Sequence, residues 1–95
     1  MSKEFVWAER VSSQKGDYIH FHVLHPWKHI GTLWWKDTKM YVGYLNKERV
    51  VALIRGKFMV LRKGYKEIGK LEKQGETQAY VGMLELKKCV QRRLV

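Results

Sequence analysis

Hydrophobic and polar residues alternate along much of the chain, and this period of two predicts β-strands. In residues 18–25 the aliphatic side chains share one side of the predicted strand: Ile19, Phe21 and Val23. The other side carries rings: Tyr18, His20 and His22. We place the aliphatic side in the core. Residues 4–11 show the same alternation, and the polar residues 12–16 predict a turn, so these two strands form an antiparallel hairpin.

A second hairpin is predicted from residues 30–36 and 39–45, around Asp37 and Thr38. With a two-residue loop, Trp34 faces Tyr41 and Lys36 faces Lys39. One side of this hairpin is a credible core surface with Leu33, Trp35, Met40, Val42 and Tyr44. The other side carries Thr32, Trp34, Lys36, Lys39 and Tyr41.

Residues 46–56 fit two structures. A short helix would begin at Asn46 and end just before Gly56. A turn and a strand fit equally well, because three residues of this stretch are β-branched: Val50, Val51 and Ile54. We favour strand–turn–strand, with the turn at Arg55 and Gly56. Residues 58–62 then predict a strand, and residues 65–71 a weaker one.

Residues 77–94 predict an amphipathic helix, because apolar residues recur at spacings of four and three: Ala79, Met83, Leu86, Val90 and Leu94. Thr77 is the expected N-cap, and Cys89 packs on the apolar face. Gly82 is costly in a helix interior and marks a close approach to the sheet.

These elements predict an α+β fold in one domain, residues 1–95, in which an antiparallel β-meander of four to six strands carries the C-terminal helix on one face. The layout of several strands followed by one long helix resembles small single-strand binders of the Whirly and Pur types. That resemblance implies that the open face of the sheet is either free for ligand or buried in a homodimer.

The net charge of +10 adds a class of partner to this picture. Such a charge attracts polyanions, and above all nucleic acid. The single cysteine and the lack of a long apolar run lead us to expect a cytoplasmic protein without a membrane span.

Rings and cations interleave most densely in residues 17–45. Opposed lysines beside opposed rings make a poor core but a good surface for stacking bases and holding phosphates, and a stacked base contributes about 1–3 kcal/mol. We therefore predict a non-catalytic protein that binds single-stranded DNA or RNA without a cofactor or metal. The predicted binding residues are Trp27, Lys28, Trp34, Lys36, Lys39, Tyr41, Arg55, Lys57, Arg62 and Lys63.

Two alternatives remain open. The run His20-Phe21-His22 resembles the His-hydrophobe-His motif of rolling-circle replication initiators and single-strand transposases. In that family two histidines bind a divalent metal and a helical tyrosine attacks the phosphodiester, which would make Tyr80 the nucleophile of a metal-dependent nickase. Otherwise His20 and His22 are surface groups that touch the ligand or simply face water. The second alternative is a structural component of a ribonucleoprotein.

Overall fold

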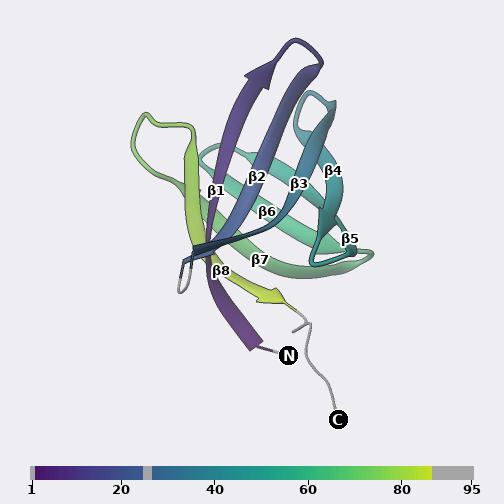
Figure 1. The fold of residues 1–95 in the computed structure, drawn as a ribbon, viewed down its shortest axis with the longest axis vertical. Helices are drawn as coiled ribbons and strands as arrows, with labels where there is room; N and C mark the ends of the chain where they lie inside the picture. The colour runs from purple at the N-terminus through teal and green to yellow at the C-terminus, as the bar shows by residue number, and fades with distance from the viewer. Residues whose placement is uncertain (1, 25–26, 87–95) are drawn as a thin grey trace.

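The computed structural model describes residues 2–24 and 27–86, which form eight β-strands. In chain order these are β1 (Ser2–Ser13), β2 (Gly16–Leu24), β3 (Trp27–Asp37), β4 (Met40–Leu45), β5 (Glu48–Arg55), β6 (Phe58–Lys63), β7 (Lys66–Lys73) and β8 (Ala79–Leu86). Each strand pairs antiparallel with its neighbours in sequence. Because β1 also pairs with β8, the sheet closes into a barrel (Figure 1).

The prediction of an α+β fold with a C-terminal helix is wrong. The first half of the predicted helix is β8, which pairs with β1 from Glu9↔Ala79 to Ser2↔Leu86. Long-range pairing with β1 overrides the local helical spacing, and it leaves no helix among the described residues. None of these residues therefore forms a helix able to cross a membrane. Residues 87–95, with the rest of that predicted helix and Cys89, lie outside the described residues.

The predicted hairpins are confirmed, although the barrel has eight strands rather than four to six. Residues 46–56, which fitted helix or strand, form a turn at Asn46 and Lys47 followed by β5. The weakly predicted strand 65–71 is β7. Strand propensity and alternation thus identified every strand except β8.

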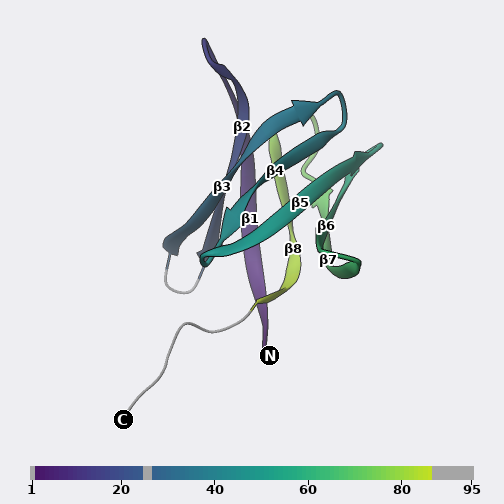
Figure 2. The same cartoon turned by 90° about the vertical axis from the view of Figure 1, so that its right-hand side faces the viewer.

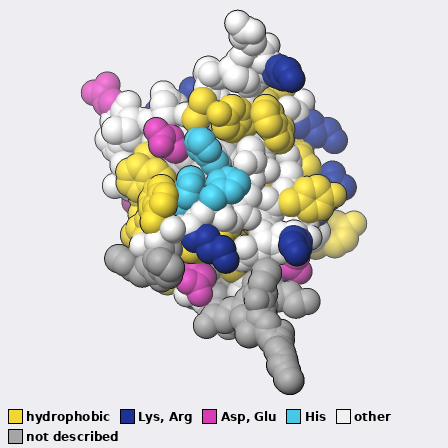
Figure 3. Space-filling model, viewed as in Figure 1, with side chains coloured by type: hydrophobic (Ala, Val, Ile, Leu, Met, Phe, Trp, Pro, Cys, Tyr) yellow, Lys and Arg dark blue, Asp and Glu magenta, His cyan; other side chains and the backbone are white. Residues whose placement is uncertain are grey.

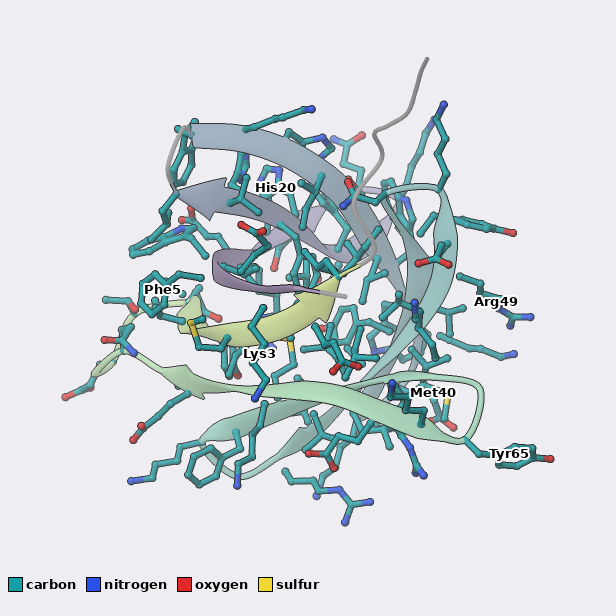
Figure 4. The ribbon with its side chains drawn as sticks, turned by 90° about the horizontal axis from the view of Figure 1, so that it is seen from below. Lys3, Phe5, His20, Met40, Arg49 and Tyr65 are labelled. Atoms are coloured by element: carbon teal, nitrogen blue, oxygen red, sulfur yellow. The ribbon has the colours of Figure 1, made fainter. Side chains whose placement is uncertain are left out.

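Inward-facing side chains fill the barrel. The largest fully buried ones come from all eight strands: Val6, Ile19, Phe21, Leu33, Tyr41, Leu45, Val50, Met59, Leu61, Leu71 and Leu84. An eight-stranded barrel has an interior just wide enough for side chains, so this core leaves the outer face of every strand as the molecular surface. Figure 4 shows outward side chains such as Phe5, Arg49 and Tyr65 pointing away from the barrel.

Two glycines allow neighbouring strands to approach closely. A Cβ on Gly43 would lie 2.1 Å from the carbonyl oxygen of Thr32, and a Cβ on Gly82 would lie 2.6 Å from that of Lys70. Neither position has room for a side chain. Gly82 therefore marks a close approach as predicted, but within a strand of the barrel rather than in a helix.

Strand order decides which surfaces lie on opposite sides. In a closed ring of eight strands, β2 stands across the barrel from β6. Figure 2 shows β2 and β3 on the left side and β6 and β7 on the right. The chain measures 43 × 26 × 24 Å, and the β1–β2 hairpin projects beyond the barrel along the longest axis (Figure 1).

Candidate functional site

A row of contacting rings covers the outer face of β1, β2 and β3. We call it the ring strip, and it consists of Trp7, Tyr18, His20, His22, Trp27, His29 and Trp34. In Figure 3 the described histidines gather on this face, with hydrophobic side chains above and to the left of them and Lys or Arg side chains below.

The ring strip is continuous from one end to the other. Ring centroids lie 4.8 Å apart between Trp34 and Tyr18 and 5.3 Å apart between Tyr18 and His20. The row continues to His22 at 5.8 Å, and His22 stacks on Trp27 at 4.3 Å. These separations are typical of directly contacting aromatic rings. The strip is therefore a continuous cluster of rings rather than one isolated ring.

Strand alternation and register build the strip. On β2, every second residue points outward, which brings Tyr18, His20 and His22 into line. Trp34 of β3 lies opposite Tyr18, and a bulge between Phe21 and His22 sets His29 opposite His22. The imidazole of His29 is 5.1 Å from that of His22, and its Nε2 forms a hydrogen bond of 3.2 Å with the hydroxyl of Thr32.

The ends of the strip are open to solvent. The side chain of Trp34 is 47 % exposed and that of Trp27 is 58 % exposed. Near the middle, partial burial and the neighbouring imidazoles of His29 and His20 lower the pKa of His22 below its usual value. His22 is therefore mainly neutral at pH 7, so that its stack on Trp27 carries no charge.

Two predicted cations lie on β3, the strand that carries both Trp27 and Trp34. Lys28 follows Trp27 on β3 and is exposed, and Lys36 is exposed near the other end of the same strand. Trp27, Lys28, Trp34 and Lys36 all lie on β3, which begins three residues earlier than the predicted strand of residues 30–36. The strip is larger than the predicted binding surface. Strand alternation placed Tyr18 and His20 on one side of the predicted strand, but neither was among the residues predicted to bind single strands.

Tyr41 does not belong to this surface. Its side chain is 2 % exposed and lies in the core. The predicted pairing of Trp34 with Tyr41 is wrong by one residue, because a bulge between Trp35 and Asp37 pairs Trp34 with Val42 instead. A one-residue slip exchanges the two faces of a strand. For the same reason three residues assigned to the core side point outward: Met40, Val42 and Tyr44.

The remaining predicted cations lie away from the strip. Arg55 ends β5, Arg62 and Lys63 lie on β6, and Lys57 lies in the turn between these strands. Lys57 pairs with Glu72 at 3.3 Å, and Lys63 pairs with Glu48 at 2.8 Å. Lys39 lines a hollow together with Arg55. The predicted site residues therefore fall into two groups on different sides of the barrel.

The nickase alternative loses its nucleophile. Tyr80 lies on β8 rather than on a helix, and its side chain is 6 % exposed. Burial raises the pKa of the Tyr80 phenol above its usual value, so the reactive phenolate is disfavoured. Within residues 2–24 and 27–86, no group of three or more His, Cys, Asp and Glu side chains is arranged to hold a metal ion.

Comparisons with protein-family models, with curated proteins and with solved structures found no significant match for this chain.

Proposed function

We propose that the protein binds single-stranded nucleic acid, DNA or RNA, along the ring strip and without catalysis. The observation that carries this proposal is the unbroken line of outward-facing ring contacts from Trp34 to Trp27. A core does not need such a line, because the barrel interior is already filled by other side chains. On the surface, exposed indoles cost solvation free energy, and a stacked base would offset that cost.

Charge supports the same partner. The net charge of +10 attracts the phosphate backbone, and Lys28 and Lys36 lie on the strand that carries Trp27 and Trp34. A single strand of nucleic acid that runs along β3 would meet an exposed indole near each end of this β-strand, which also carries two exposed lysines. This is the arrangement that binds single strands in general: rings take the bases, and cations take the phosphates.

Unpaired bases fit the strip better than a duplex does. The rings lie side by side on the outer wall of a barrel, so they stack only on bases whose faces are free. A duplex hides those faces, and the described residues provide no helix to enter a major groove. We therefore expect the protein to prefer single strands to duplexes of equal length.

Tryptophan fluorescence tests this proposal. Titrating the protein with a short oligothymidylate should quench the fluorescence, because bases stack on Trp27 and Trp34. The affinity measured from the quench should fall as salt is added. A plot of log affinity against log salt concentration should fall with a slope of about 0.7 for each phosphate contact. A duplex should quench less. Absence of quenching by any single strand would contradict the proposal, whereas binding only to folded ribosomal RNA would favour the ribonucleoprotein alternative.

A further inference from the structure

A second candidate binding surface lies on the outer face of β5, β6 and β7, and its lining is mainly cationic rather than aromatic. It is a hollow of about 380 Å³, and we call it the cationic hollow. Phe58 and Val60 form an apolar part of its lining, and the charged part is formed by Arg55, Arg62, Lys70 and Glu67. Three cations thus face one carboxylate, which leaves an excess of positive charge.

The cations of the hollow are available to a ligand. Among the described residues, ion pairs occupy the neighbouring Lys57 and Lys63, but none involves Arg55, Arg62 or Lys70. The guanidinium of Arg62 donates a hydrogen bond of 3.3 Å to the carbonyl oxygen of Tyr65, while its Nε is buried with no hydrogen-bond partner.

A second hollow extends the cationic one toward the β3–β4 turn. It has a volume of about 420 Å³ and shares Leu53 and Arg55 with the first. Lys39 lines its far part, where the backbone N–H of Ile54 donates to the carbonyl oxygen of Lys39 at 2.9 Å. Cations therefore follow one another along the surface from Lys39 through Arg55 to Lys70. Such a row matches the repeated phosphates of an extended strand.

One ring lies within this row of cations. The ammonium group of Lys70 is 4.7 Å from the centroid of the Phe58 ring, and that of Lys57 is 5.5 Å from it. Phe58 thus lies between the ammonium groups of Lys70 and Lys57, and contributes an apolar surface beside them. Nucleic acid carries a phosphate at every nucleotide, so a nucleic-acid strand matches this row of cations better than an acidic protein segment does.

The cationic hollow and the ring strip lie on opposite sides of the closed barrel, since β6 stands across from β2 (Figure 2). We propose that the cationic hollow binds a second single strand, so that one protein molecule bridges two strands. This inference rests on the proposed function of the ring strip, but the two can fail separately.

Energy transfer between two labelled oligothymidylates tests the bridging. These strands do not pair with each other, so transfer requires the protein to hold both. We expect transfer with the natural chain and its loss in the double variant Arg55→Gln, Lys70→Gln, which changes two exposed residues and leaves the core intact. The same variant should keep the tryptophan quench given by a single oligomer. The double variant Lys3→Gln, Lys47→Gln is the matched control, because it removes equal charge outside both surfaces and should keep the transfer.

Three results would overturn the bridging. The first is quenching by a single strand without any energy transfer, which would leave the proposed function standing alone. The second is transfer that persists in the Arg55→Gln, Lys70→Gln variant, as bridging by a dimer would give. The third is binding of polyglutamate, but not oligothymidylate, that requires Arg55 and Lys70. If no single strand quenches the tryptophans, the bridging and the proposed function both fail.

Discussion

The imidazole of His22 stacks on the indole of Trp27, with ring centroids 4.3 Å apart and planes inclined by 14°. This stack holds one face of Trp27 against the barrel and leaves the side chain more than half exposed. Partial burial, followed by the charges of His29 and His20 when protonated, lowers the pKa of His22, while Glu9 acts in the opposite direction. The stack therefore links an exposed part of the ring strip to an imidazole whose pKa lies below its ordinary value.

The lowered pKa of His22 predicts a pH-dependent stability. As the pH falls, the unfolded chain takes up the proton first, because His22 titrates there near its ordinary value of 6.5. The free energy of unfolding should therefore decrease as the pH falls through this value and on through the lower pKa of the folded state. Urea unfolding at several pH values measures this decrease. The variant His22→Gln should show a smaller decrease, and an unchanged one would refute the assignment to His22.

The turn between β4 and β5 offers a stabilising substitution. Asn46 and Lys47 have φ angles of 50° and 68°, as in a two-residue hairpin turn that favours Asn-Gly. A lysine in this left-handed conformation is strained, and glycine is not. Lys47→Gly should raise the free energy of unfolding by about 0.5–1 kcal/mol, after allowance for the flexibility of glycine in the unfolded chain. A chemical denaturation curve that shifts to lower denaturant would be the contrary result.

The close contact of β3 with β4 predicts a destabilising substitution at Gly43, on the strand that leads into this turn. A Cβ on Gly43 would meet the carbonyl oxygen of Thr32, which is part of the backbone and does not move freely. Gly43→Ala should lower the free energy of unfolding by about 1–3 kcal/mol. Thermal unfolding should show a lower melting temperature for Gly43→Ala and a higher one for Lys47→Gly. An unaffected Gly43→Ala variant would mean that the strands lie further apart than described.

Much of the fold could be predicted because strand alternation is a local signal. Ile19, Phe21 and Leu33 were placed in the core from their period of two, and all three are fully buried. The faces of β4 could not be assigned in the same way. A bulge adjacent to Asp37 shifts the register by one residue, and the sequence of that turn does not favour one tight-turn type. That single shift buries Tyr41.

The strand β8 was mistaken for a helix for a different reason. Its inward positions include Gly82, which carries no side chain, while Val81 and Met83 add apolar residues to the outward side. The period of two is therefore hidden, and the spacing of Ala79, Met83 and Leu86 mimics a helix. Pairing with β1 decides the conformation, and partners so far apart in sequence leave no local pattern.

The candidate site could be predicted only in part. Trp27, Lys28, Trp34 and Lys36 share one strand, but local reasoning placed only Trp34 and Lys36 on it, because the predicted strand began at residue 30. Arg55 and Arg62 were expected to extend the same surface, but closure of the barrel carries β5 and β6 round to another side. Curvature of the whole sheet is a property of all eight strands, so no segment of the sequence encodes it alone.

Two neighbouring tryptophans provide the most direct test of the ring strip. Trp34 and Trp35 have similar exposure, 47 % and 51 %. Trp34 contacts Tyr18 within the strip, whereas Trp35 is paired with Tyr41 and points to the other face of β3. The affinity of each alanine variant for a short oligothymidylate should be measured at one salt concentration. We expect Trp34→Ala to weaken binding by about tenfold or more, since one stacked base is lost, and Trp35→Ala to leave it nearly unchanged. Equal losses in both variants, or no loss in Trp34→Ala, would contradict binding along the ring strip.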